Sequence, residues 1–146
     1  MEKETIKNIL DFIEKNDNKT SSKSLEFLEI PRFLEKLESG IAFTEDELIL
    51  RGNLDLSETD ITKLPDGLQV GGYLNLRFLD IEILPEGLKV GGDLSLRGCK
   101  HLRSLPKGLI VKGYLFLINS SLKKYTDEQL REMIEPDGFI NGKIIR

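Results

Sequence analysis

The sequence predicts a short β solenoid, in which repeated segments stack on one another, with different segments before and after the repeats. Three observations indicate this fold: a pentapeptide that recurs, leucines that alternate with polar residues, and glycines at a constant offset between them. Successive pentapeptides begin 20 and 21 residues apart, a period at which one unit must stack on its neighbours to bury its apolar side. The copies are Leu64-Pro65-Asp66-Gly67-Leu68, Leu84-Pro85-Glu86-Gly87-Leu88 and Leu105-Pro106-Lys107-Gly108-Leu109.

Residues 1–40 differ from the repeats and are expected to form an N-terminal helical unit. Apolar residues recur at helical spacing from Ile6 to Ile13, which predicts an amphipathic helix that ends near Asn16. The polar residues 17–22 are expected to link this helix to a second one.

The second helix is predicted to start at Pro31, because proline is favoured in a first turn and removes a hydrogen bond from a helix interior. Gly40 is the expected stop. The sequence leaves open whether Leu25 and Leu28 begin an earlier helix. The apolar face of the predicted helix consists of Phe33, Leu34 and Leu37.

The repeat region, residues 41–118, is expected to contain two short strands per coil. L-x-L pairs and a Leu-x-Val or similar alternation after each pentapeptide both have the period of two that is typical of strands. Glycines such as Gly71-Gly72 predict a corner where φ is positive or where coils approach closely. One residue is inserted between Leu96 and Leu102, and we expect it to bulge at a turn without shifting the strands. The L-x-L pairs are Leu54 and Leu56, Leu74 and Leu76, Leu94 and Leu96, and Leu115 and Leu117.

Residues 119–146 are expected to form a C-terminal unit of one helix and one hairpin. A capping-box pattern at Thr126 predicts a short helix through about Ile134. A turn is predicted at residues 136–138, and residues 139–145 are predicted to form a hairpin around an Asn-Gly turn. We expect both terminal units to cap the solenoid within one structural domain, since a solenoid exposes apolar coil ends.

The repeat unit L-P-x-G-L-x-V-G-G-x-L-x-L resembles the short leucine-rich repeats of phage and bacterial proteins and of secreted bacterial ubiquitin-ligase effectors. The match covers about half of the chain. It implies a strand that lines a concave, protein-binding face and helices that cover the first coil. Two features depart from it: Thr59 and Leu79 stand where many such repeats place a buried asparagine, and no ligase domain or catalytic cysteine motif is present. The resemblance therefore implies a scaffold for protein recognition without the effectors' enzymatic activity.

The polar positions of the L-x-L strands are predicted to stack into a partner-binding face. Tyr, Phe and Arg are enriched at interface hot spots, whereas a solvated strand face favours Thr, Lys and Glu. The sequence leaves open whether Tyr114, Phe116 and Ile118 bind a partner or pack beneath the C-terminal helix. The expected ladders are Asn53-Tyr73-Asp93-Tyr114, Asp55-Asn75-Ser95-Phe116 and Ser57-Arg77-Arg97-Ile118. The predicted binding residues are Tyr73, Asn75, Arg77, Asp93, Arg97, Tyr114 and Phe116.

Charge is uneven along the chain, whose formal net charge is −4. Acidic residues dominate where the repeats begin, whereas none occurs between Leu94 and Thr126. Three interpretations stay open: solvated surface charge, a basic patch that binds nucleic acid or an acidic protein, and salt-sensitive self-association of opposite ends. The acidic residues are Glu45, Asp46, Glu47, Asp55, Glu58, Asp60 and Asp66. The alternative basic patch consists of Arg97, Lys100, Arg103, Lys107, Lys112, Lys123 and Lys124.

We expect a non-catalytic protein without a metal or cofactor, because the sequence lacks the residue groups that such chemistry needs. Cys99 has no His and Asp partners in a catalytic pattern, so it is predicted to be a small buried filler. His101 is the only histidine and is predicted to lie in a turn. The glycine pairs recur with the repeat and match no phosphate-binding loop.

The sequence favours a cytoplasmic protein without membrane contact, because it has one cysteine, no apolar run of about 18 residues and no export signal at its start. The favoured function is binding of a protein partner through the solenoid face. The resemblance to phage repeats suggests an inhibitor of a host complex. The alternative is binding of nucleic acid or another acidic surface through the basic C-terminal half of the solenoid.

Overall fold

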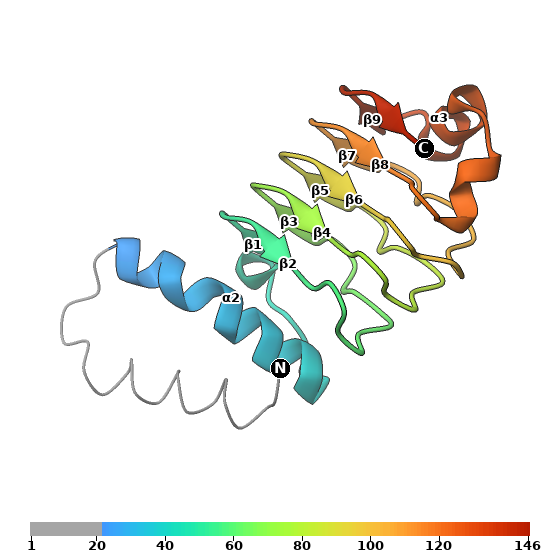
Figure 1. Ribbon diagram of the computed structural model, residues 1–146. Coiled ribbons are helices and arrows are strands. Elements are labelled where there is room, and N and C mark those ends of the chain that lie inside the picture. Colours follow the sequence, from blue (N-terminus) through green and yellow to red (C-terminus); the bar gives the residue numbers. More distant parts are fainter. Residues whose placement is uncertain (1–21) are drawn as a thin grey trace.

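The repeats coil into a solenoid with two parallel sheets, as the sequence predicts (Figure 1). The structure is a computed structural model that describes the backbone of residues 22–146 and the side chains of residues 30–146. Each sheet has five strands, and one strand from each sheet forms a rung of the solenoid. One sheet contains β1 (Ile49–Leu50), β3 (Gln69–Val70), β5 (Lys89–Val90), β7 (Ile110–Val111) and β9 (Phe139–Ile140). The other contains β2 (Leu54–Asp55), β4 (Leu74–Asn75), β6 (Leu94–Ser95), β8 (Leu115–Phe116) and β10 (Ile144–Ile145).

The strand register confirms the alignment of the repeats. The first leucines of the four L-x-L pairs lie opposite one another in β2, β4, β6 and β8. The inserted residue lies at a turn that includes Lys100 and His101, and the strands on both sides keep their register. Both predictions, the harmless insertion and the turn position of His101, are therefore confirmed.

The glycine corners between the two sheets exist because adjacent coils approach closely there. A Cβ atom on Gly71 would lie 2.4 Å from the carbonyl oxygen of Arg51, and one on Gly91 would lie 2.2 Å from that of Gly71. None of these corner glycines has a positive φ. Of the two reasons that the sequence left open for these glycines, close approach is the one that applies.

The core lies inside the coils and consists of the leucines and valines of the strands together with the pentapeptide leucines. Cys99 is fully buried in it, as predicted, and its Sγ donates to the carbonyl oxygen of Leu76 at 3.0 Å. Burial raises the pKa of the Cys99 thiol to about 11, because a thiolate would lose its hydration there. The side chain is therefore a neutral thiol at neutral pH.

The helix before the repeats, α2 (Ser22–Ser39), contains Pro31 in its interior, so the prediction that Pro31 lies in the first turn is wrong. An interior proline costs about 3 kcal/mol. Burial of Phe33 and Leu34 in the solenoid core offsets this cost, since a buried side chain of this size contributes about 1.5–3 kcal/mol. Gly40 follows the helix with a φ of +70° and ends it as predicted. The predicted helix that ends near Asn16 lies outside the described residues.

In the segment after the repeats, the predicted helix is present and the predicted hairpin is not. The helix α3 (Asp127–Ile134) begins with the expected capping box, in which Thr126 and Gln129 exchange hydrogen bonds. The predicted hairpin is wrong, because β9 pairs with β7 and β10 pairs with β8, both in parallel. Gly142 forms a corner like those of the repeats, and its N–H donates to the carbonyl oxygen of Gly113 at 2.9 Å. Residues 139–145 therefore form a fifth rung.

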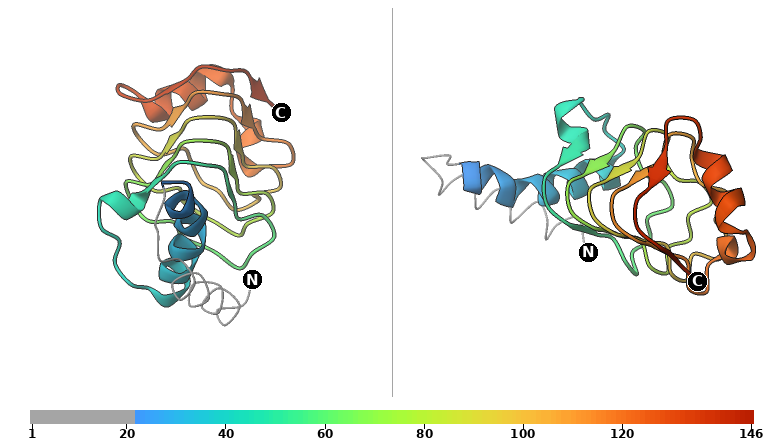
Figure 2. Two further views of the ribbon diagram at one scale, coloured as in Figure 1. Left: turned by 90° about the vertical axis from the view of Figure 1, so that its left-hand side faces the viewer. Right: turned by 90° about the horizontal axis from the view of Figure 1, so that it is seen from above.

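The helices lie at the two ends of the stack, with α2 beside the first rung and α3 beside the last (Figure 2). In place of a further pentapeptide, α3 leads the chain into the fifth rung, and the carbonyl oxygen of Ile134 at its end accepts from the N–H of Gly108. Two short 3₁₀ helices complete the described structure, η1 (Asp46–Leu48) and η2 (Ser121–Lys124).

Candidate partner-binding face

The outer side of the sheet β2-β4-β6-β8-β10 carries the three predicted ladders. We call this outer side, with the residues of those ladders, the ladder face. Backbone hydrogen bonds join each strand to the strand of the neighbouring coil, for example from Leu74 N–H to Asp93 C=O and from Phe78 N–H to Arg97 C=O, each at 2.9 Å. The ladder face is consequently held by the backbone of every coil that it crosses.

Some polar residues of the ladder face stabilise the coils themselves. The Oδ1 atom of Asp93 accepts from the backbone N–H of Tyr114 at 2.8 Å, and that of Asn75 accepts from the N–H of Arg77 at 3.2 Å. In the first coil, Asp55 accepts from the Ser57 hydroxyl at 2.6 Å, and this bond is the main cause that lowers the pKa of Asp55. Asp93 and Asn75 were predicted as partner contacts, and the structure gives both of them an internal hydrogen bond.

The tyrosines of the ladder face remain open to solvent. Tyr73 is 43% exposed and Tyr114 is 45% exposed. Tyr114 packs edge-to-face against Phe116, with ring centroids 6.3 Å apart, and Phe116 is half-buried. The ring of Tyr114 also lies over Gly142, where a Cβ atom would come within 2.2 Å of its Cδ1. The fifth rung, rather than helix α3, therefore borders this aromatic pair, and Tyr114 keeps a free surface.

The arginines of the ladder face differ in their surroundings. Arg97 is exposed, whereas Arg77 is half-buried and places its guanidinium over the ring of Phe78, with Cζ 5.5 Å from the centroid. Within residues 22–146, the Nε atom of Arg77 is buried without a hydrogen-bond partner. The Arg77 side chain thus lies along an exposed aromatic ring that the sequence analysis did not single out.

A residue with a left-handed backbone follows the ladder face in each of four coils. The φ values are +59° at Glu58, +61° at Phe78, +73° at Gly98 and +58° at Asn119. We call these residues the left-handed column. This conformation costs a residue with a side chain roughly 1–2 kcal/mol, least for asparagine and nothing for glycine. Gly98 and Asn119 at one repeat offset were a signal in the sequence, but the prediction did not use it. Phe78 is the least suited member and is 48% exposed.

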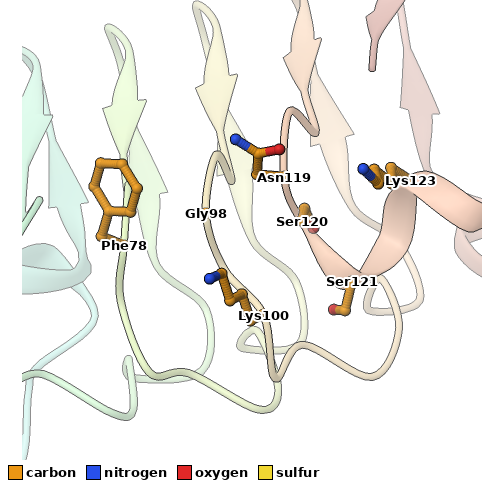
Figure 3. Close-up of a pocket in the computed structure, with 7 residues that line it drawn as sticks. All are labelled: Phe78, Gly98, Lys100, Asn119, Ser120, Ser121 and Lys123. Carbon is orange, nitrogen blue, oxygen red and sulfur yellow. The ribbon is translucent and has the colours of Figure 1, made fainter.

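The structure divides the predicted basic patch among several sides of the coil. Arg103 pairs with Glu82 at 3.0 Å, and Lys124 lies over the ring of Tyr125 at 5.3 Å. Lys107 lies in a pentapeptide and Lys112 at a glycine corner, both away from the left-handed column. Arg97 precedes that column, and Lys100 and Lys123 both line one cavity, which Gly98 and Asn119 also line (Figure 3).

Other kinds of site find no support in the part of the chain that the structure describes. Among the side chains of residues 30–146, which the structure describes, no three His, Cys, Asp or Glu residues are grouped so that they could hold a metal ion. Across residues 22–146, no helix has the length and apolar character needed to cross a membrane. Comparisons with protein-family models, with curated proteins and with solved structures each found no match to this chain.

Proposed function

We propose that the protein is a non-catalytic module that binds a protein partner through the ladder face. The observation that carries this proposal is the exposure of two tyrosine side chains, 43% for Tyr73 and 45% for Tyr114. Both lie on a face that backbone hydrogen bonds between the coils hold in place. Large exposed aromatics next to arginines are the side chains that most often dominate protein interfaces.

The rigidity of the ladder face favours binding. Each ladder residue belongs to a strand or to the turn beside it, so little backbone freedom is lost on association. Asp93 lies one rung from Tyr73 and one rung from Tyr114. The distance between neighbouring parallel strands sets the spacing of these three side chains. A partner would therefore meet a preformed row of aromatic and charged groups.

The resemblance to short leucine-rich repeats of phage proteins supports a more specific form of the proposal, an inhibitor of a host complex. In this form of the proposal, the helices α2 and α3 act as caps that shield the ends of the solenoid.

The test is an affinity pull-down from host lysate, followed by mass spectrometry, with and without nuclease. The double variant Tyr73→Ala/Arg97→Ala should lose a nuclease-resistant protein, with affinity reduced at least about 30-fold as for a hot-spot pair. The matched control is Gln69→Ala/Lys89→Ala on the opposite sheet, which should retain the same protein. If the double variant retains it as well, the ladder face is not the binding surface.

Nucleic-acid binding is the second candidate, and the joint position of Lys100 and Lys123 favours it. Binding to phosphates weakens steeply as salt rises, whereas an interface anchored by aromatic residues changes much less. Capture of only nuclease-sensitive material, lost at raised salt, would replace the protein-binding proposal with this one.

Self-association of the acidic and basic ends is tested separately by light scattering at low salt and high protein concentration. Ion pairs between opposite ends would produce oligomers that dissociate as salt is added. A monomer under these conditions would remove this possibility without affecting the protein-binding proposal.

A further inference from the structure

A cavity of about 580 Å³ lies beside the ladder face, along the left-handed column. Phe78 lies at one end of it and Lys123 at the other, with Gly98 and Asn119 between them (Figure 3). Its size falls within the range of about 300–1,000 Å³ that is typical of ligand sites. The residues that line it are Phe78, Gly98, Lys100, Asn119, Ser120, Ser121 and Lys123.

The polar groups of the cavity favour an anion. It is lined by two lysines and by no carboxylate. Within the described chain, neither Lys100 nor Lys123 has an ion-pair partner, and the amide of Asn119 makes no hydrogen bond. The Ser121 hydroxyl donates to the carbonyl oxygen of Leu102 at 2.5 Å, so its proton is already used. The side-chain donors left for a ligand are thus two ammonium groups, the amide of Asn119 and the hydroxyl of Ser120, which only accepts a hydrogen bond from the N–H of Leu122.

The apolar end of the cavity depends on the absence of a side chain at Gly98. A Cβ atom there would lie 2.3 Å from Cδ1 and 2.6 Å from Cε1 of Phe78, so that edge of the ring occupies the space above the glycine. Phe78 keeps this position in spite of its left-handed backbone, and strain of this kind is concentrated at functional sites. The ring remains half exposed, at the end of the cavity opposite Lys123.

We propose that this cavity binds a carboxylate side chain of an acidic protein segment, with an apolar side chain of the same segment against Phe78. The proposal rests on the proposed function, because the cavity adjoins the ladder face through Arg77 and Arg97. It deepens that function by stating the chemistry of the partner. Lys100 and Lys123 hold the carboxylate, and Asn119 donates a hydrogen bond to it.

A nucleic-acid backbone fits the same surface less well. Tight binding of a phosphate chain needs a row of cationic residues that neutralises several phosphates. Here Arg77 and Arg97 adjoin the cavity, but Lys107 and Lys112 lie elsewhere on the coil and Arg103 pairs with Glu82. Glu58 continues the left-handed column beyond Phe78 and would repel a phosphate chain. Two lysines suffice for a short acidic segment.

The experiment is an NMR titration of the full protein with three probes. They are an acetylated and amidated Leu-Glu-Glu-Leu peptide, the matching Leu-Gln-Gln-Leu peptide, and a short oligothymidylate. The glutamate peptide should shift the backbone amide signals of Gly98, Lys100, Asn119 and Ser121, and the glutamine peptide should not. Equal shifts with both peptides, no shifts with either, or shifts with the oligothymidylate alone would each overturn the proposal.

Two lysine variants give the test a matched control. Lys100→Ala/Lys123→Ala should weaken binding of the glutamate peptide roughly three- to tenfold, the size expected for two solvent-screened ion pairs. Lys107→Ala/Lys112→Ala removes the same charge from exposed sites outside the cavity and should leave the affinity unchanged. Equal weakening in the two variants would show general charge attraction and overturn the assigned site.

The failure of this inference is distinguishable from the failure of the proposed function. If Tyr73→Ala/Arg97→Ala abolishes partner capture while the Lys100/Lys123 variant leaves peptide binding intact, the ladder face binds a partner and the cavity assignment is wrong. If the lysine variant weakens peptide binding while Tyr73→Ala/Arg97→Ala retains the partner, the cavity stands and the ladder-face proposal fails.

Discussion

Each coil changes direction on the two sides of its L-x-L strand, and these two places obey different constraints. Before the strand, the second corner residue is glycine in all five rungs, and at Gly113 a Cβ atom would lie 2.8 Å from the carbonyl carbon and oxygen of Gly92 in the preceding coil. After the strand, the left-handed column has a positive φ in four coils, but only Gly98 is a glycine. Residues other than glycine can adopt a positive φ at a cost in free energy. A contact between a Cβ atom and the backbone of the neighbouring coil is different, because no side-chain rotation relieves it.

The residue type varies more after the strand than at the second corner position before it. The second position of the corner is glycine in every rung, whereas the first is glycine only at Gly71 and Gly91 and is Arg51, Lys112 or Asn141 in the other rungs. The left-handed column contains four different residue types whose side chains are not required by the coil. A cavity with polar donors lies along this variable column and not along the glycine corner. Substitutions at the glycine corner and in or beside the left-handed column test this difference.

The largest effect is expected for Gly113→Ala, at the corner position that is glycine in every rung. The new Cβ would lie 2.8 Å from the carbonyl carbon and oxygen of Gly92, so the coils must separate, and we expect a loss of about 3 kcal/mol in the free energy of unfolding. Gly52→Ala is the control, because that position has open space, and it should change stability by less than about 1 kcal/mol. Urea denaturation measures both. Equal losses would show that close approach does not explain the corner glycines.

A smaller loss is expected for Gly98→Ala, which combines a left-handed alanine with contact to the Phe78 ring. The backbone term is about 1–2 kcal/mol, and the ring can rotate away at a modest further cost. The same substitution in a Phe78→Asn background isolates the backbone term. If the two backgrounds lose the same stability, the ring does not occupy the space above Gly98.

A pH-dependent effect is expected from Cys99, which follows Gly98 and is fully buried. Its folded-state pKa of about 11 lies above that of an unfolded thiol, about 8.5. The unfolded state therefore loses its proton first, so this contribution to stability is complete below about pH 8.5 and falls as pH rises to about 11. Urea denaturation under reducing conditions at both ends of this range measures it. Cys99→Ala should reduce the dependence, and an unchanged slope would contradict the assignment.

The smallest effect on stability is expected for Phe78→Asn. Asparagine tolerates a positive φ, and the gain offsets the lost contact with Arg77, so the free energy of unfolding should change by less than about 0.5 kcal/mol. Binding of the glutamate peptide should weaken in the same variant. A loss of stability above about 1.5 kcal/mol would instead identify Phe78 as a packing residue of the coil.

The sequence was sufficient to predict the rungs, because a period of two within strands and a period of 20 or 21 between coils both follow from local chemistry. The same holds for the capping box at Thr126, which depends on residues three apart. The fifth rung was missed, since α3 lengthens the spacing between the corners Gly113 and Gly142 beyond the repeat. Pro31 was misplaced because propensity does not include the packing of α2 against the solenoid.

The ladders of the predicted face were correct for the same periodic reason, and so was the position of every residue within them. Local sequence patterns did not predict the hydrogen-bond partners or the exposure of individual side chains. Asp93 accepts a hydrogen bond from Tyr114 in the next coil, Asn75 accepts one from Arg77 in its own turn, and Phe78 emerged as an exposed residue. The contact of Asp93 joins residues that are neighbours only after the coils have stacked.

Stacked coils and the set of inward-pointing side chains follow from the sequence alone, because alternation and repeat length depend on short-range geometry. Three features follow only from the folded chain: the terminal segment joins both sheets, the neighbouring backbone lies close to the corner glycines, and Lys100 and Lys123 line one cavity. Each of these is a relation between different coils. Such relations are set by how closely coils pack, and packing is a property of the folded chain as a whole.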